Sequence, residues 1–263
     1  MTATARWSPA RASTDMRVLI LGGTQEAFRL AEHLADVVGI EIISSLAGRT
    51  REPRIPKGDV RTGGFGGAEG LARYLREQRI THLVNATHPF AERISANAIA
   101  AAEAAGIPLM RLLRPAWIAR RDDRWVAAHH AAEAAELCRR EGGRIFLTLG
   151  SGELDAFADV HNAHFLVRMV DLPEALPLRD YRTIAARGPF SLQDELRLLA
   201  EHHISLIVAK NSGGDATYAK IEAARRMGLP VIMIERPPLA LDPRSPAVAS
   251  VDDVVAWVQR LRG

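Results

Sequence analysis

Short apolar runs alternate with amphipathic segments through the first half of the chain. Each apolar run is short, aliphatic and β-branched, which is typical of a buried strand, and the segments between them carry apolar residues at helical spacing. The expected strands are 17–23, 40–48, 58–65, 80–86 and 107–115, and the expected helices are 24–38, 67–79 and 91–106. Strands that alternate with crossover helices predict an α/β fold with a parallel sheet.

The second half of the chain repeats this pattern. RVLILGG resembles RIFLTLGSG, VRTGGF resembles YRTIAARGPF, RITHLVNATHPF resembles HISLIVAKNSGG, and Arg114-Pro115 matches Arg236-Pro237. Matches in the same order favour a duplicated unit. We therefore expect two α/β domains of similar build with a cleft between them, over residues 16–120 and 121–263, after a disordered extension over 1–15.

Two of the apolar strands run into polar loops that suit helix starts. One ends in Asn85-Ala86-Thr87-His88-Pro89 and its counterpart in Lys210-Asn211-Ser212-Gly213-Gly214. In open parallel sheets, ligands bind beyond the carboxyl ends of the strands. The two loops are therefore expected to line opposite walls of the cleft.

A glycine turn follows the first strand. Gly22 and Gly23 allow a tight turn and the close approach of a phosphate, and Thr24 can cap the helix that follows. The pattern is not G-x-G-x-x-G, and on its own it could be an ordinary helix start. Its place in a βαβ unit favours dinucleotide binding.

The end of the next strand indicates which dinucleotide. An NAD site usually carries Asp or Glu about 20 residues after the glycines. This strand instead ends in Ser44 and Ser45, followed by Arg49, Thr50 and Arg51. Hydroxyl and guanidinium groups suit the 2′-phosphate of NADP(H), although a solvated basic loop is the alternative.

Two further segments carry weaker signals. Gly63 and Gly64 follow the third strand, where glycines allow either close ligand approach or a flexible loop. In the second half, the turn at Gly150-Ser151-Gly152 could cradle a carboxylate or be a duplicated turn without a ligand. Ser191 and Asp194 have the spacing of a helix-capping pair.

Composition narrows the function classes. The chain has 263 residues, 48% hydrophobic and 25% charged, with a net charge of +3 from 34 basic and 31 acidic residues. The scattered basic residues and few aromatic residues argue against nucleic-acid binding, and no apolar run reaches the length of a membrane span. A single cysteine favours a reducing compartment, so a cytoplasmic protein is expected. The histidines lack the spacing of a metal site.

The motifs LILGGTQEA, ATHPFA, RGPF and KNSGG, in this order, resemble the precorrin-6A reductase family. The resemblance covers essentially residues 16–240 and implies two Rossmann-like domains with parallel sheets, with the cofactor and the tetrapyrrole between them. It implies an NADPH-dependent oxidoreductase of cobalamin biosynthesis that transfers a hydride to a ring double bond of precorrin-6A, giving precorrin-6B. A polycarboxylate tetrapyrrole would also suit a mildly basic protein; the oligomeric state stays open, with a monomer as the working expectation.

The resemblance also assigns roles to residues. The expected cofactor-binding residues are Gly22, Gly23, Thr24, Glu26, Ser44, Ser45, Arg49, Thr50, Gly64, Thr87, His88 and Phe90. The expected substrate-binding residues are Lys210, Asn211, Ser212, Gly213, Thr217 and Lys220. His88 and then Lys210 are the candidate proton donors, with water or the substrate itself as alternatives. A different NADP-dependent reductase and a non-catalytic NADP-sensing module remain as rival functions.

Overall fold

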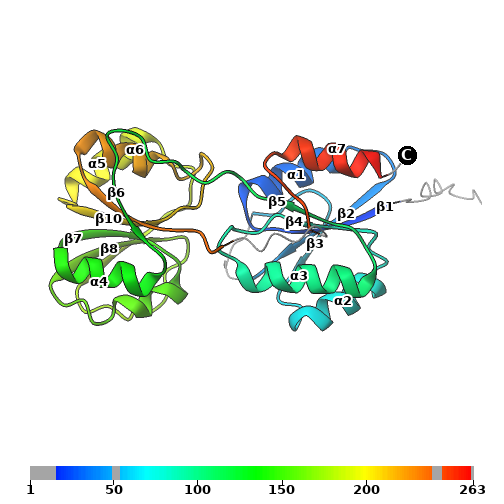
Figure 1. Cartoon of the computed structure of the whole chain (residues 1–263), viewed down its shortest axis with the longest axis horizontal. Coiled ribbons are helices and arrows are strands. Elements are labelled where there is room, and N and C mark those ends of the chain that lie inside the picture. The colour runs from blue at the N-terminus through cyan, green and yellow to red at the C-terminus, as the bar shows by residue number, and fades with distance from the viewer. Residues whose placement is uncertain (1–15, 49–53, 239–244, 262–263) are drawn as a thin grey trace, which may run out of the picture. The chain divides into compact units, whose positions relative to one another are not determined.

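The computed structural model describes residues 16–48, 54–238 and 245–261. These residues form two compact units (Figure 1). The first contains the described residues up to Leu113 together with 245–261, and the second runs from Arg114 to residue 238. Within the described ranges, no helix combines the length and apolar character needed to cross a membrane.

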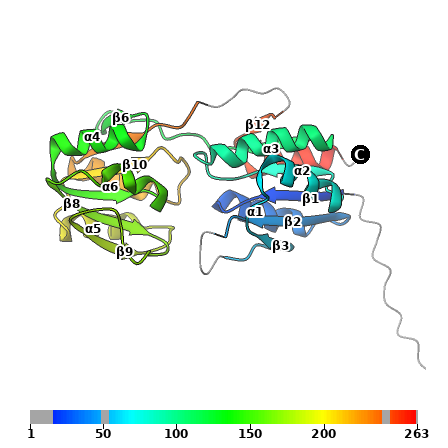
Figure 2. The ribbon, with the colours of Figure 1, turned by 90° about the horizontal axis from the view of Figure 1, so that it is seen from below.

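The first unit contains a six-stranded sheet in the order β12-β5-β4-β1-β2-β3, in which every paired strand is parallel. Its strands are β1 (Met16–Leu21), β2 (Ile40–Leu46), β3 (Asp59–Thr62), β4 (His82–Asn85), β5 (Leu109–Leu112) and β12 (Ala247–Val248). Figure 2 shows β1, β2 and β3 side by side. The chain adds β2 and β3 on one side of β1 and then returns to add β4 on the other. This reversal creates a switch point between β1 and β4, where ligands of open α/β sheets bind.

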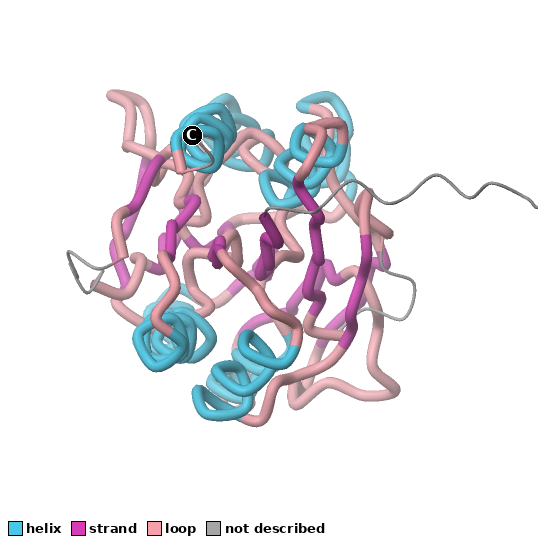
Figure 3. The backbone as a smooth tube through the Cα atoms, turned by 90° about the vertical axis from the view of Figure 1, so that its right-hand side faces the viewer, coloured by secondary structure: helices cyan, strands magenta, loops and turns pink. Residues whose placement is uncertain are grey.

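Helices cover both faces of this sheet (Figures 1 and 3). On one face lie α1 (Gln25–Ala35) and α7 (Val251–Arg260), and on the other lie α2 (Gly67–Glu77) and α3 (Glu92–Ala105). Alternate residues of β1 serve the two cores: Val18 and Ile20 pack beneath α1, and Leu19 and Leu21 pack beneath α2 and α3. Burial on both faces explains why β1 reads as a continuous apolar run.

The second unit has a sheet of the same build, in the order β6-β11-β10-β7-β8-β9. Its strands are β6 (Arg124–Ala128), β7 (Gly143–Thr148), β8 (Ala163–Met169), β9 (Tyr181–Ala185), β10 (Leu206–Lys210) and β11 (Pro230–Ile234). Its helices are α4 (Ala131–Glu141), the 3₁₀ helix η1 (Ser151–Phe157), α5 (Leu192–Glu201) and α6 (Ala219–Met227). The switch point here lies between β7 and β10. These two parallel sheets confirm the expected α/β fold with two Rossmann-like halves.

The edge strands β6 and β12 come from different places in the chain. In the second sheet, β6 and α4 precede β7, whereas in the first sheet β12 and α7 come after the whole second unit. Both helices start with a similar cap, because His130 accepts a hydrogen bond from the N–H of Glu133 and Ser250 accepts one from Asp253.

The expected limits of the domains therefore differ from the compact units. We expected residues 121–263 to form the second domain, but β12 and α7 complete the first sheet. The physical reason is the apolar face of α7, where Val254 and Val258 are fully buried in the core that contains Val18 and Ile20. The expected boundary at residue 120 also falls within the second unit, which begins at Arg114.

Candidate active site

The glycine turn lies at the switch point of the first sheet. Gly23 has φ +105°, and an added Cβ there would meet none of the described atoms within 4 Å beyond its chain neighbours. Gly22 differs, because its Cβ would lie 3.3 Å from the Ala27 Cβ, so its lack of a side chain lets α1 pack closely on β1. The turn therefore offers open space directly before the free N–H groups of α1, which suits an anion such as a pyrophosphate.

Thr24 fixes the shape of this turn. Its Oγ1 accepts a hydrogen bond from the N–H of Ala27 at 3.1 Å, which caps α1, and donates to the carbonyl of Ala86 at 2.7 Å. The side chain is buried at 8% exposure. These backbone contacts give Thr24 a structural role: it ties the glycine turn to the loop that follows β4.

The end of β2, where we expected the 2′-phosphate to bind, differs from the prediction. Ser44 and Ser45 are 2% and 6% exposed, so their hydroxyls are poorly placed to meet a ligand. Arg49 and Thr50, the other two residues of this expectation, lie outside the described residues. The described cation at this edge is Arg61 at the end of β3.

Arg61 holds the ends of two strands together. Its Nη1 donates to Ser45 Oγ at 2.7 Å and to the Gly63 carbonyl at 2.9 Å, and its Nη2 donates to the Gly64 carbonyl at 3.0 Å. The guanidinium stacks over the Phe65 ring at 3.8 Å. Burial lowers the pKa of Arg61 from its ordinary value. Sequence reasoning missed this residue, although it lies within the quoted VRTGGF motif and has a counterpart in YRTIAARGPF.

The loop after β4 is built around Asn85, which is 5% exposed. Its Oδ1 accepts from both the N–H and the hydroxyl of Thr87, at 3.2 and 2.7 Å, and its Nδ2 donates to Ser95 Oγ at 3.0 Å. His88 Nδ1 accepts from the Phe90 N–H at 3.3 Å, which places the proton of a neutral imidazole on Nε2. The expected residues Thr87, His88 and Phe90 therefore share one loop, joined through Thr24 to the glycine turn.

Beneath this loop lies a small pocket of the first unit. It is lined by Asn85, Thr87, His88, Pro89, Ser95, Arg111, Leu112 and Leu113. Arg111 on β5 pairs in register with Asn85 and is 8% exposed, and burial lowers its pKa. Arg111 lies inside the predicted strand 107–115, and nothing in the sequence pattern marked it as a site residue.

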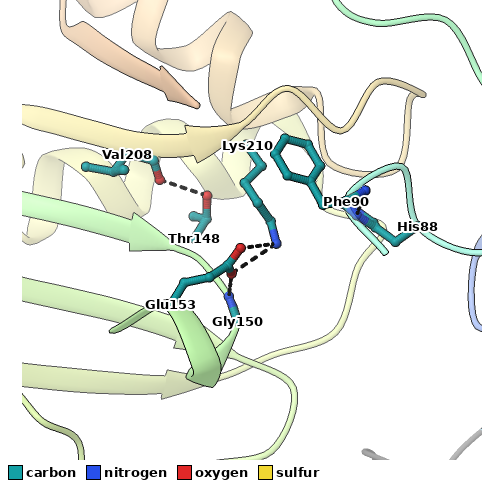
Figure 4. A network of polar contacts seen from close by, with 7 residues as sticks. All are labelled: His88, Phe90, Thr148, Gly150, Glu153, Val208 and Lys210. Atoms are coloured by element: carbon teal, nitrogen blue, oxygen red, sulfur yellow. Dashed lines mark hydrogen bonds and ion pairs between the residues drawn. The ribbon is translucent and has the colours of Figure 1, made fainter. Parts of the chain in front are cut away.

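In the second unit, Lys210 lies at the end of β10, beside the end of β7. Its Nζ donates to both carboxylate oxygens of Glu153, at 2.8 and 3.0 Å (Figure 4). Glu153 Oε2 also accepts from the Gly150 N–H at 2.9 Å. The sequence left open whether the Gly150 turn binds the carboxylate of a ligand, and the carboxylate bound there is the side chain of Glu153. Lys210 is thus at the expected strand end, and sequence reasoning missed its partner.

Two expected substrate-binding residues serve the backbone of the loop after β10. The Asn211 side chain accepts from the Trp117 N–H at 2.8 Å and donates to the Trp117 carbonyl at 3.0 Å. Gly213 has φ +67°, and an added Cβ would lie 2.0 Å from the Pro115 carbonyl oxygen. Both residues therefore fix the shape of the loop, and Gly213 is required by packing inside the unit.

Arg114 and Arg236, from the repeated Arg-Pro pairs, hold the same loop. Arg114 Nε donates to the Ser212 carbonyl at 2.7 Å, and Arg236 donates to the carbonyls of Asn211 and Ser212 at 2.8 and 2.9 Å. Lys220 was also expected to face the substrate, but it is 4% exposed and its Nζ donates to the Thr217 carbonyl at 2.8 Å. The loop is thus supported from several sides by its own unit.

The expected residues that the structure describes fall into two groups. Gly22, Gly23, Thr24, Glu26, Gly64, Thr87, His88 and Phe90 lie at or near the carboxyl edge of the first sheet, with Ser44 and Ser45 buried at the same edge. Lys210, Asn211, Ser212, Gly213 and Thr217 follow β10 at the carboxyl edge of the second sheet, and Lys220 lies buried in α6.

Comparison with known proteins supports one family. The chain is 52% identical over 248 residues to a precorrin-6A reductase of Rhodococcus erythropolis, covering 93% of this chain and 98% of the relative. It is 43% identical over 243 residues to a precorrin-6A reductase of Rhodobacter capsulatus, covering 92% of this chain and 95% of the relative. A solved CobK precorrin-6A reductase matches the structure with a TM-score of 0.88 at 42% identity, covering 93% of this chain and 96% of the other. The model of the family described as "Precorrin-6x reductase CbiJ/CobK" matches residues 17–259, and the chain belongs to that family.

Proposed function

We propose that this chain reduces precorrin-6A to precorrin-6B with NADPH, as a step of cobalamin biosynthesis in the cytoplasm. Its family is one of reductases, so the chain is an oxidoreductase. The observation that carries the choice of cofactor site is the open, left-handed turn at Gly23, which heads α1 at the switch point of the first sheet. That position is where dinucleotides bind in folds of this class.

The residues of the first unit fit a dinucleotide. The open space at Gly23 and the N–H groups of α1 would hold the pyrophosphate, and Gly22 and Thr24 keep that turn in shape. The cofactor supplies the hydride when it is bound. Through the Thr24–Ala86 hydrogen bond, the loop with Thr87, His88 and Phe90 is held beside the turn, where it can orient the nicotinamide end and limit the access of water.

The preference for NADPH over NADH rests on the ends of β2 and β3. Neither Ser44 nor Ser45 is acidic, so the usual carboxylate partner of an unphosphorylated ribose is not found among the described residues at the end of β2. Arg61 contributes positive charge nearby and fixes the Gly63–Gly64 backbone. A 2′-phosphate is therefore the better match to this edge.

The second unit would bind the substrate through the loop after β10. The Lys210 ammonium suits the carboxylates of a tetrapyrrole, and Glu153 holds it in one orientation. His88 and Lys210 are the two groups we propose as proton donors. His88 would donate from Nε2 as an imidazolium, a form in which Nδ1 no longer accepts from the Phe90 N–H, and Lys210 would donate as an ammonium.

Two rival functions are tested by the same experiment. A different NADP-dependent reductase would oxidise NADPH with another substrate, and a nucleotide-sensing module would bind NADPH without turnover. We expect NADPH absorbance to fall only when precorrin-6A is added, with a product of the mass expected for two added hydrogens. Tight NADPH binding without any oxidation in the presence of precorrin-6A would reject the proposed function.

A further inference from the structure

Three charged residues of the second unit lie buried where β8, α5 and α6 meet. Arg168 on β8 is 8% exposed, Glu195 in the first turn of α5 is 1% exposed, and Lys220 in the first turn of α6 is 4% exposed. Removing charges from water is costly, and an apolar replacement of a buried ion pair is often neutral or stabilising. Fold stability alone is therefore a poor explanation for this cluster.

An ion pair joins Arg168 to Glu195, and Lys220 interacts with both of them through their charges. Arg168 Nη2 forms an ion pair with Glu195 Oε1 at 2.8 Å, and neither carboxylate oxygen of Glu195 has a hydrogen-bond partner among the residues that the structure describes. Lys220 Nζ lies 5.1 Å from the centre of the Trp117 ring. Burial, reinforced by Arg168 and opposed by Glu195, lowers the pKa of Lys220 to about 7. The surroundings of Lys220 therefore disfavour its ammonium form.

The cluster supports two loops from below. The Arg168 guanidinium stacks at 3.7 Å on the ring of Phe190, which belongs to the loop between β9 and α5. Lys220 donates to the carbonyl of Thr217 in the loop between β10 and α6. The two loops also contact each other, because the Phe190 N–H donates to the Ala216 carbonyl at 3.3 Å. One buried cluster thus contacts both loops on the carboxyl edge of the second sheet.

We propose that Arg168, Glu195 and Lys220 are positioning residues that hold the loops 186–191 and 211–218 in the conformation that receives the substrate. The proposal rests on the proposed function only in naming precorrin-6A as that substrate. Lys220 acts through the Thr217 carbonyl and Arg168 through Phe190. In this scheme the cluster fixes the loop that follows Lys210 and leaves the glycine turn of the first sheet untouched.

The test replaces Lys220 by methionine, which keeps much of the side-chain length and removes the charge and the donor. We expect KM for precorrin-6A to rise about tenfold or more, as for loss of a charge-assisted hydrogen bond, while the dissociation constant of NADPH stays within about twofold. Lys57→Met is the matched control, because Lys57 is exposed and pairs with Asp36 in the first unit. Its kinetic constants should equal those of the wild type.

Amide hydrogen exchange gives a readout independent of turnover. In Lys220→Met the amides of 211–218 should exchange faster than in the wild type, and those of α1 should not change. A second variant, Arg168→Met with Glu195→Met, removes the ion pair as a unit and should loosen 186–191 as well. Because the three residues form one network, the effects of the two variants on KM should be non-additive.

The outcomes separate this proposal from the proposed function. If the wild-type protein does not reduce precorrin-6A, the proposed function is wrong. The comparison of hydrogen exchange then tests the role of the cluster by itself. With an active wild type, unchanged KM and unchanged exchange in Lys220→Met overturn the cluster proposal. Equal losses of NADPH and precorrin-6A binding would overturn it too, since they indicate general unfolding. If Lys220→Met does not fold, the Arg168→Met/Glu195→Met variant decides by the same criteria.

Discussion

Lys210 at the end of β10 forms a bidentate ion pair with Glu153 of η1, which follows the neighbouring strand β7, with Nζ–O distances of 2.8 and 3.0 Å. Glu153 is in turn fixed by the Gly150 N–H. A flexible lysine is thereby held in one direction at the switch point of the second sheet, where ligands of such sheets bind. The pair is partly exposed, at 17% and 30% of the two side chains, so a ligand can reach it.

Glu153→Gln should lower kcat/KM for precorrin-6A and leave NADPH affinity unchanged. The amide keeps the shape of the carboxylate but loses the charge that orients the Lys210 ammonium, a loss of about 1–2 kcal/mol, or roughly 5- to 30-fold. Steady-state kinetics measures this. Glu136→Gln is the control, because Glu136 forms an exposed ion pair with Arg139 on the surface of α4. A variant as active as the wild type would leave Glu153 with no part in positioning Lys210.

Lys210→Ala should weaken precorrin-6A binding and leave NADPH affinity nearly unchanged. The lysine belongs to the second unit and the glycine turn to the first. A lost charged contact to a substrate carboxylate is worth about 1.5–3 kcal/mol, or roughly 10- to 150-fold in affinity. Equilibrium titration of each ligand would measure the two dissociation constants. Loss of NADPH binding with normal substrate binding would reverse the assignment of the two units.

The sequence predicted the parts of the fold that follow from local patterns. Strands such as β1 and β10 are continuous apolar runs between turn residues, so their place could be read directly, and the Ser191–Asp194 cap is confirmed by a hydrogen bond of 3.1 Å. The assignment of β12 could not be predicted in this way. It has only two residues, Ala247–Val248, and its place beside β5 depends on packing between segments far apart in the chain.

The candidate site was also predicted only in part. Motif reasoning placed Gly23 and Lys210 at strand ends, as the structure has them. It could not distinguish residues that face a ligand from residues that support a loop, because Asn211 and Lys220 look equally polar in the sequence. Their roles depend on burial and on partners such as Trp117 and the Thr217 carbonyl. Glu153 was missed for a related reason, since its partner Lys210 is 57 positions away in the chain.

Thr24→Val should destabilise the first unit and weaken NADPH binding. Valine keeps the shape but loses the cap of α1 and the hydrogen bond to the Ala86 carbonyl. Together these are worth about 1–3 kcal/mol. Chemical denaturation gives the free energy of unfolding, and Thr24→Ser, which retains the hydroxyl, should lie close to the wild type. If the valine variant binds NADPH normally, the shape of this turn is unimportant for the cofactor.

His88→Ala should lower kcat. A positioned general acid contributes about 10²–10⁴-fold, and an orienting contact contributes much less. The pH profile of kcat should lose one limb if His88 is the donor. His88→Gln serves as the comparison, since its side chain can still accept the hydrogen bond from the Phe90 N–H. A decrease below about tenfold with an unchanged pH profile would remove His88 as the proton donor.

The buried Lys220 should make stability depend on pH in the alkaline range. Its pKa is lowered from 10.5 to about 7 by burial, with Arg168 lowering it further and Glu195 raising it. Between about pH 7 and pH 10 the unfolded chain therefore binds more protons at this residue than the folded protein does. Stability relative to a Lys220→Met variant should then rise with pH through this window, and the cost of the buried charge should be fully present below about pH 7.

The upper limit of this slope is about 1.4 kcal/mol per pH unit for one proton. The measurement is the difference in unfolding free energy between wild type and Lys220→Met, taken by urea denaturation from about pH 6 to pH 10, so that other titrating groups cancel. Nuclear magnetic resonance of the lysine side chains offers a direct check, because the chain has only Lys57, Lys210 and Lys220. A flat difference, with the Lys220 side chain titrating near its ordinary pKa, would show that Lys220 stays charged because Glu195 outweighs its burial.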